Sequence, residues 1–147
     1  MKFAAFASLL TFALGAHAAT VTASVSYDQT YDNAKTSLDV VACSNGPHGL
    51  EALGFTNFGS LPNFPFIGGA GAVEGFDSVN CGTCWQLTYT NGSGAKKSIN
   101  VLAIDHSAAG TFNIALEAMN TLTGNQAERL GRVNVQATQV DKSVCKF

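Results

Sequence analysis

Hydrophobic and polar residues alternate along several short stretches of this chain, which is the pattern of half-buried β-strands. The last stretch, Gly131–Asp141, alternates most regularly. Trp85–Thr90 and Lys97–Asp105 flank the turn sequence Asn91-Gly92-Ser93-Gly94, and together they predict a β-hairpin. Strands are therefore predicted at Thr20–Asp28, Leu38–Cys43, Trp85–Thr90, Lys97–Asp105 and Gly131–Asp141.

Helical signals are fewer. A helix is predicted over Phe112–Gly124, because its apolar residues recur at helical spacing, Asn113 can cap its start and Gly124 can end it. His48–Phe55 predicts one shorter helix. Gly54–Asp77 has the prolines and glycines of a long loop, and its phenylalanines indicate that this loop packs. Short strands, small helices and no β-α-β alternation predict a mainly β fold, a barrel or a sandwich.

The N-terminal 18 residues predict a cleaved signal peptide (residues 1–18). Lys2 follows the initiator methionine, an apolar run extends over Phe3–Leu14, and Ala16 and Ala18 are the small residues that signal peptidase reads. Cleavage is predicted after Ala18, with Ala19 as the alternative. The apolar run is shorter than the ~20 residues of a membrane span. The sequence thus predicts an exported, soluble chain with one domain over residues 19–147.

The charge and composition of the chain limit the kinds of molecule that it is expected to bind. Without Lys2 the chain has 7 basic and 10 acidic residues, a net charge of −3. No basic stripe or polybasic segment indicates nucleic acid or anionic lipid. Charged residues make up only 12% of the chain, while Gly, Ser, Thr and Asn are plentiful. Such a surface suits neutral polar partners, including sugars.

All four cysteines lie in the predicted exported part. Oxidising conditions favour two disulfides, and four cysteines allow 3 pairings. In a cytosolic chain the spacing in Cys81-Gly82-Thr83-Cys84 would indicate a redox motif or half of a zinc site, but the leader argues against both. The histidines of the exported part, His48 and His106, have no Cys or carboxylate at ligand spacing, so neither a metal nor a cofactor is predicted.

Asp105 is the main candidate for chemistry. It ends the apolar stretch Ile99–Ile104 and precedes a glycine-containing loop, a position well suited to face a cleft. The alternative is a turn aspartate that accepts local backbone hydrogen bonds. Glycoside hydrolysis needs a second carboxylate, and no acid shows a recognisable pairing with Asp105, which weighs against hydrolysis. The acids considered were Asp28, Asp32, Glu74 and Asp77.

Two further features leave alternatives open. Asn91-Gly92-Ser93 is an N-glycosylation sequon as well as a turn. Aromatic side chains can stack on sugars or pack in the core, and the alternation of Trp85 with Leu87 favours the core for Trp85. The aromatic residues considered were Tyr27, Tyr31, Trp85 and Tyr89.

The chain resembles the cerato-platanins, small secreted fungal proteins, over about residues 19–147. Two cysteine-containing runs carry most of the resemblance, Cys43-Ser44-Asn45-Gly46 and Cys81-Gly82-Thr83-Cys84-Trp85. Further matches are Val25-Ser26-Tyr27-Asp28, His48-Gly49-Leu50, Gly75-Phe76-Asp77-Ser78, Ile104-Asp105 and Phe112-Asn113.

The resemblance implies a mainly β fold, a six-stranded double-psi β-barrel with short helices, similar to an expansin domain. It implies the disulfides Cys43–Cys81 and Cys84–Cys145. It also implies a shallow carbohydrate-binding groove around one aspartate. Carried onto this chain, the groove residues are Asp105, Tyr27, Ser44, Asn45, Gly46 and Asn113.

The resemblance further implies a non-catalytic protein of the fungal wall and the extracellular medium. Members bind chitin or N-acetylglucosamine oligomers, some loosen cellulosic material, and many elicit plant defence. A monomer that can self-assemble at interfaces and a host receptor as partner are implied as well. Two other readings stay open, a weak polysaccharide-cleaving enzyme and a surface-active elicitor whose sugar binding is incidental.

Overall fold

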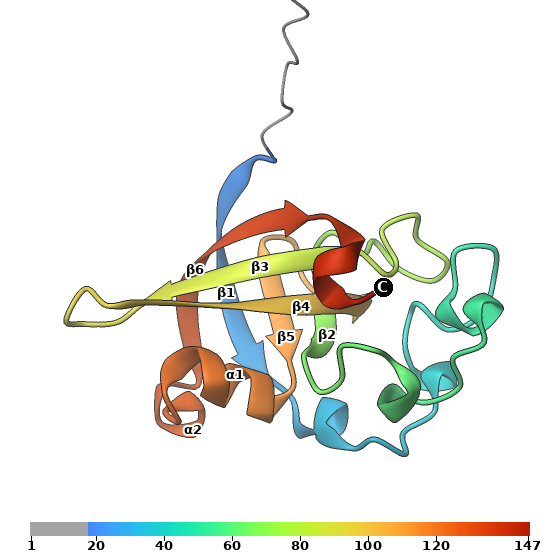
Figure 1. The fold of residues 1–147 in the computed structure, drawn as a ribbon, viewed down its shortest axis with the longest axis horizontal. Coiled ribbons are helices and arrows are strands. Elements are labelled where there is room, and N and C mark those ends of the chain that lie inside the picture. Colours follow the sequence, from blue (N-terminus) through green and yellow to red (C-terminus); the bar gives the residue numbers. More distant parts are fainter. Residues whose placement is uncertain (1–17) are drawn as a thin grey trace, which may run out of the picture.

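Six strands close into a barrel in the order β1-β5-β2-β4-β3-β6 in the computed structural model, which describes residues 18–147 (Figure 1). Two neighbouring pairs, β1–β5 and β2–β4, are parallel, and the remaining pairs are antiparallel. The predicted six-stranded barrel is confirmed. The strands are β1 (Thr20–Tyr27), β2 (Ile67–Ala70), β3 (Cys84–Thr90), β4 (Lys96–His106), β5 (Thr111–Ile114) and β6 (Arg132–Val140).

Alternation along the strands fills the barrel. Val25 of β1 is fully buried, and its pairing partner Val133 of β6 points the same way. The residues next to these valines along each strand are polar and face outward: Ser24 and Ser26 in β1, and Arg132 and Asn134 in β6. Apolar residues of all six strands thus belong to one core cluster. The strand predictions for β1, β3, β4 and β6 are confirmed.

Two α-helices, α1 (Leu116–Thr123) and α2 (Ala127–Leu130), lie together beside one end of the barrel in Figure 1. The long connection between β1 and β2 starts next to α1 and continues along the right of Figure 1, where it forms single 3-10 turns instead of strands. These turns are η1 (Gln29–Asp32), η2 (Leu38–Val40), η3 (Leu50–Leu53) and η4 (Phe58–Ser60), and η5 (Lys142–Cys145) follows β6. The predicted short helix at His48–Phe55 corresponds to η3.

The strand predicted at Leu38–Cys43 is wrong. Leu38 begins the 3-10 turn η2, and the Ser37 hydroxyl caps it by accepting from the Asp39 N–H. Leu38 is fully buried while Asp39 and Val40 are exposed, so only one side chain of this turn reaches the core. The run resembles a strand because it contains the β-branched pair Val40 and Val41, but Val40 is exposed in the turn.

Strand β2 lies inside the segment predicted as a loop, so that prediction is wrong for residues 67–70. Glycine has low strand propensity, which conceals a strand of sequence Ile67-Gly68-Gly69-Ala70. Close packing requires these glycines: a Cβ at Gly68 would lie 2.3 Å from the backbone oxygen of Asn113. Strand β2 therefore fits between β4 and β5 only without side chains at these two positions.

The helix predicted over Phe112–Gly124 begins later than expected. Phe112 and Asn113 belong to β5, and α1 starts at Leu116, so Asn113 does not cap it. The cap comes from Asp32 of η1, whose two carboxylate oxygens accept from the N–H groups of Leu116 (2.8 Å) and Glu117 (2.9 Å). The predicted end is confirmed, since Gly124 closes α1 with a positive φ of 70°.

Both implied disulfides are present, Cys43–Cys81 and Cys84–Cys145. The first ties the middle of the long connection, after η2, to the segment before β3. The second fixes η5 against the start of β3. Because every cysteine is paired, Cys81 and Cys84 cannot form a redox pair with each other.

Candidate functional site

Asp105 reaches the surface of the barrel through a β-bulge. In the parallel pair β2–β4, Gly68 pairs with Ala103 but Gly69 pairs with Asp105, so Ile104 is an extra residue. Regular alternation would point Asp105 to the same side as Ala103, which is buried. The bulge turns Asp105 to the outer face instead, which is a common use of bulges at binding sites.

Three donors hold the Asp105 carboxylate. The Tyr31 hydroxyl donates to Oδ2 at 2.9 Å, while the backbone N–H groups of Ala42 (2.9 Å) and His106 (2.8 Å) donate to Oδ1. Burial, and then the charge of Asp105, raise the pKa of Tyr31 far above its ordinary value, so Tyr31 stays a proton donor. A carboxylate offers about four acceptor positions. Asp105 is half-buried and keeps acceptor capacity for an external donor.

Gly69 aligns Asp105 with a row of polar side chains. Gly69 pairs with Asp105 on one side and with Asn113 of β5 on the other, and Asn113 pairs with Ser26 of β1. Ser26 in turn pairs with Arg132 of β6. These residues alternate with buried ones, so their side chains lie on the outer face of the barrel. We call Asp105, Gly69, Asn113, Ser26 and Arg132 the polar row.

Hydrogen bonds orient the amide in the polar row. Arg132 donates to the Ser26 hydroxyl at 2.8 Å, so that hydroxyl uses its own proton to donate to Asn113 Oδ1 at 3.0 Å. Because its oxygen is occupied, Asn113 presents its Nδ2 donor outward. Between the Asp105 acceptor and the Asn113 donor lies Gly69, which is buried; the His106 carbonyl oxygen would lie 2.7 Å from a Cβ there, so the backbone after β4 covers this position.

The predicted groove residues occupy different places. Asp105 and Asn113 lie in the polar row. Tyr27 follows Ser26 in β1, is half-buried and packs against the core, on the other face of the strand. Ser44 is 5% exposed and Asn45 is exposed.

The loop that carries Asn45 starts beside the site, because the N–H of Cys43 donates to the carbonyl of Ile104 (3.1 Å). Gly46 packs against Asp77, and with a φ of 96° it must be a glycine. Ligand contact is untested for all six predicted groove residues, Asp105 and Asn113 included, so these roles stay predictions.

Three of the carboxylates considered as partners for Asp105 hold backbone groups. Asp28 accepts from the N–H of Thr30 (2.8 Å) and caps η1. Asp32 caps α1, and Asp77 accepts from the N–H of His48 (2.7 Å). Glu74 is exposed. Within residues 18–147, no three His, Cys, Asp or Glu side chains lie close enough together to hold a metal ion.

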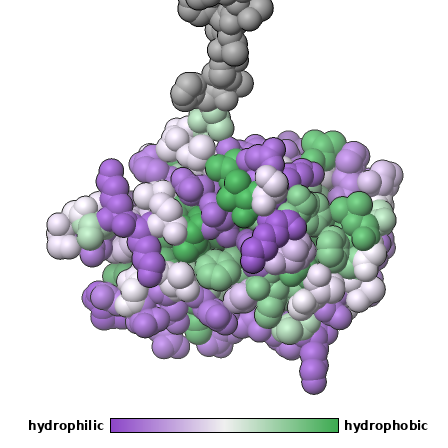
Figure 2. All heavy atoms as spheres, viewed as in Figure 1, coloured by the Kyte–Doolittle hydropathy of each residue, from purple (hydrophilic) through white to green (hydrophobic). Residues whose placement is uncertain are grey.

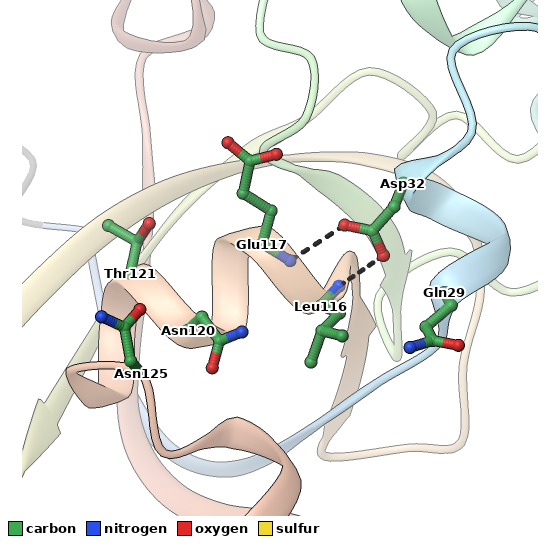
Figure 3. A pocket seen from close by; sticks show the side chains of 7 residues that line it. All are labelled: Gln29, Asp32, Leu116, Glu117, Asn120, Thr121 and Asn125. Carbon is green, nitrogen blue, oxygen red and sulfur yellow. Dashed lines mark hydrogen bonds between the residues drawn. The ribbon is translucent and has the colours of Figure 1, made fainter.

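A separate cleft of about 590 Å³ lies between η1 and α1 (Figure 3). Its lining carries amides, one hydroxyl, two acids and no basic residue, so it suits a neutral polar molecule better than an anion. Asp32 sits at its edge with both oxygens committed to the helix. The lining residues are Gln29, Asp32, Leu116, Glu117, Asn120, Thr121 and Asn125.

The aromatic residues divide between packing and support of the site. Tyr31 is buried against Phe58, with ring centroids 5.8 Å apart, and serves Asp105 through its hydroxyl. Trp85 is half-buried, meets Phe112 edge-on and donates to the Thr83 hydroxyl at 3.0 Å. Trp85 therefore packs against the core, as its alternation predicts.

The sequence analysis did not identify Ser26, Gly69 or Arg132 as members of the site. Only pairing between distant strands brings them together, and no local motif encodes that register. The run from Gly68 to Gly71 was the one available signal.

The geometry defines a class of protein, a small disulfide-bonded β-barrel with a row of polar side chains beside one fixed carboxylate. Among the helices of residues 18–147, none has the length and hydrophobicity needed to cross a bilayer.

Known proteins match this chain over most of its length. The cerato-platanin family profile matches residues 23–147. Cerato-platanin from Ceratocystis fimbriata f. sp. platani is 43% identical over 129 residues, which are 87% of this chain and 90% of that protein. A protein of Arthroderma benhamiae named Allergen Asp f 15 homolog is 49% identical over 149 residues, 100% of this chain and 70% of that protein.

Solved structures agree. The crystal structure of cerato-platanin 1 from M. perniciosa has a TM-score of 0.80 and 47% identity, covering 84% of this chain and 98% of that one. The chain belongs to the cerato-platanin family, as the resemblance predicts.

Proposed function

We propose that this protein binds chitin-type N-acetylglucosamine oligomers on the polar row without cleaving them. The observation that carries the proposal is the alignment of Asp105, Gly69 and Asn113 across three neighbouring strands. Half-buried polar groups that their own hydrogen bonds hold in fixed orientations suit an uncharged, hydroxyl-bearing ligand.

The polar groups match the chemistry of this ligand. Asp105 accepts hydrogen bonds from sugar hydroxyls, and the outward Nδ2 of Asn113 donates to an N-acetyl carbonyl. Both groups are oriented before the ligand arrives, Asp105 by three donors and Asn113 by Ser26. Such preorganisation reduces the entropy lost on binding.

The roles of the other acids support binding without catalysis. Hydrolysis of a glycosidic bond needs two carboxylates that flank it. Asp28, Asp32 and Asp77 each accept from backbone N–H groups that their turns or helix require. Asp105 itself accepts three hydrogen bonds that hold its carboxylate in place.

The proposal includes where the protein acts. After export, it works in the fungal wall and the surrounding medium, where competition for polysaccharide hydrogen bonds loosens chitin or cellulose, as an expansin does. Recognition by a host receptor makes it an elicitor. We propose that it acts as a monomer in solution.

One observation favours a second candidate function, activity at apolar interfaces. Phe76 and Val79 lie on one loop and are 66% and 68% exposed. Figure 2 shows further hydrophobic residues interspersed on the visible face. An elicitor that assembles at interfaces through these side chains would bind sugar only incidentally. A Phe76→Ser/Val79→Ser variant that keeps chitin binding but loses surface activity would separate the two candidates.

The test is an NMR titration of the oxidised protein with N-acetylglucosamine oligomers of increasing length. We expect affinity to rise with length, amide shifts at Asp105, Gly69 and Asn113, and no cleaved products. Asp105→Ala should abolish binding. Asp105→Asn keeps an oxygen that can accept from its backbone donors, so it controls for loss of fold. Asp141→Asn, an exposed aspartate of the C-terminal segment, is the matched control and should bind normally.

Three results would contradict the proposal. Released products that depend on Asp105 would make the protein an enzyme. Unchanged affinity in a folded Asp105→Ala variant would remove the assigned site. Shifts at Gln29 and Asn120 instead of Asp105 would move binding to the cleft between η1 and α1.

A further inference from the structure

The β3–β4 hairpin extends beyond the rest of the barrel as a two-stranded arm (Figure 1). Pairing of β3 with β6 ends at Thr88, and pairing of β4 with β2 begins only at Leu102. All residues from Thr90 to Ser98 are exposed. The tip therefore lies in solvent, and Figure 2 draws the end of this arm in white, pale green and purple, without a strongly hydrophobic residue.

Asn91-Gly92-Ser93, at the tip of the arm, is the single N-glycosylation sequon of the chain. Asn91 Oδ1 accepts from the Ser93 hydroxyl (2.7 Å), the Ser93 N–H (3.0 Å) and the Ala95 N–H (2.9 Å). The turn thus brings the sequon hydroxyl against the asparagine side chain. Because the oxygen faces the turn, the Nδ2 amide of Asn91 faces away from it.

Nothing around the tip obstructs a large substituent. Asn91 is exposed, and within residues 18–147 its Nδ2 donates no hydrogen bond to another residue. A Cβ at Gly92 or Gly94 would meet no atom within 4 Å. A glycan on Nδ2 therefore fits without rearranging the folded arm.

We propose that Asn91 carries an N-linked glycan. In the transfer step the Nδ2 of Asn91 forms a bond to the anomeric carbon of an oligosaccharide carried on a lipid diphosphate. The bond between that carbon and the diphosphate oxygen breaks, Nδ2 loses one proton, and the lipid diphosphate leaves. The proposal requires the predicted export of the chain and does not depend on sugar binding at the polar row.

The position of the glycan separates it from the polar row. Asn91 and Asp105 lie at opposite ends of the hairpin, and at about 3.4 Å per residue β4 alone spans roughly 30 Å between them. The polar row therefore stays accessible. Near the tip the glycan covers strand edges that pair with no neighbouring strand, and open edges of this kind promote association between chains.

The experiment is mass spectrometry of the protein secreted by a filamentous fungal host, before and after peptide-N-glycosidase treatment. We expect a hexose-containing mass on the peptide that contains Asn91, and conversion of Asn91 to aspartate by the glycosidase. Asn91→Gln and Ser93→Ala should both remove the added mass, whereas Ser93→Thr, which keeps the hydroxyl, should retain it. Asn134→Gln, an exposed asparagine outside any sequon, is the matched control and should remain glycosylated.

Two outcomes would overturn the proposal. One is an unmodified Asn91 in the secreted protein. The other is an added mass that resists the glycosidase and persists in Asn91→Gln, which would place the sugar on a hydroxyl elsewhere.

Discussion

Replacing Tyr31 by phenylalanine tests how the Asp105 carboxylate is held. The change removes one hydroxyl, which donates to Asp105 Oδ2 at 2.9 Å from a side chain that is 6% exposed. A hydrogen bond to a charged group contributes about 1.5–3 kcal/mol to stability. Asp105 keeps two backbone donors and is half-buried, so water can replace part of the loss. We therefore expect the lower end, about 1.5 kcal/mol.

Urea denaturation measures this loss. With a slope of about 1.5 kcal/mol per molar urea, the midpoint should fall by about 1 M without a change in slope. Tyr89→Phe is the matched control, because Tyr89 is half-buried on β3 and its hydroxyl forms no hydrogen bond within the described part of the chain. It should leave the midpoint nearly unchanged. Equal midpoints for wild type and Tyr31→Phe would refute the role of the hydroxyl, and equal losses in both variants would attribute the effect to the aromatic ring.

Three further outcomes follow from the structure. Asp32→Ala should lower the free energy of unfolding in urea by about 1–2 kcal/mol, because α1 loses its only side-chain cap, whereas Glu117→Gln in the same first turn should change little. Because folding raises the pKa of Tyr31, its hydroxyl loses its proton at a lower pH in the unfolded chain than in the folded one. Stability should then be complete below about pH 10, fall as pH rises above it, and fall less steeply in Tyr31→Phe; parallel pH profiles would contradict this. Reduction of both disulfides should cost about 2–5 kcal/mol per bridge, and an unchanged melting temperature after verified reduction would contradict their structural role.

Features with a local cause could be predicted from the sequence. The hairpin of β3 and β4 was predictable because alternation and the turn at Asn91 encode the same structure. Strand β6 was predictable because its apolar and polar residues alternate regularly, which places the apolar face in the core. Gly124 ends α1 as expected, since a positive φ favours glycine.

Features that depend on distant partners could not be predicted. Strand β2 forms because β4 and β5 supply hydrogen bonds on both sides, and its glycines alone would indicate a loop. The Asp105 carboxylate was found from its position at a strand end, but its neighbours depend on a bulge and on strand register. The cap of α1 comes from Asp32, far away in the sequence, so the search for a local cap selected Asn113.

The 3-10 turn η1 couples the candidate site to the rest of the fold. Its Tyr31 donates to Asp105, and the next residue, Asp32, caps α1. A third donor to Asp105, the N–H of Ala42, precedes Cys43, which the disulfide to Cys81 anchors. A purely structural aspartate would need no exposure to solvent. Asp105 instead combines several fixed donors with partial exposure, and a rigid acceptor that still reaches solvent is what recognition of a hydroxyl-bearing ligand requires.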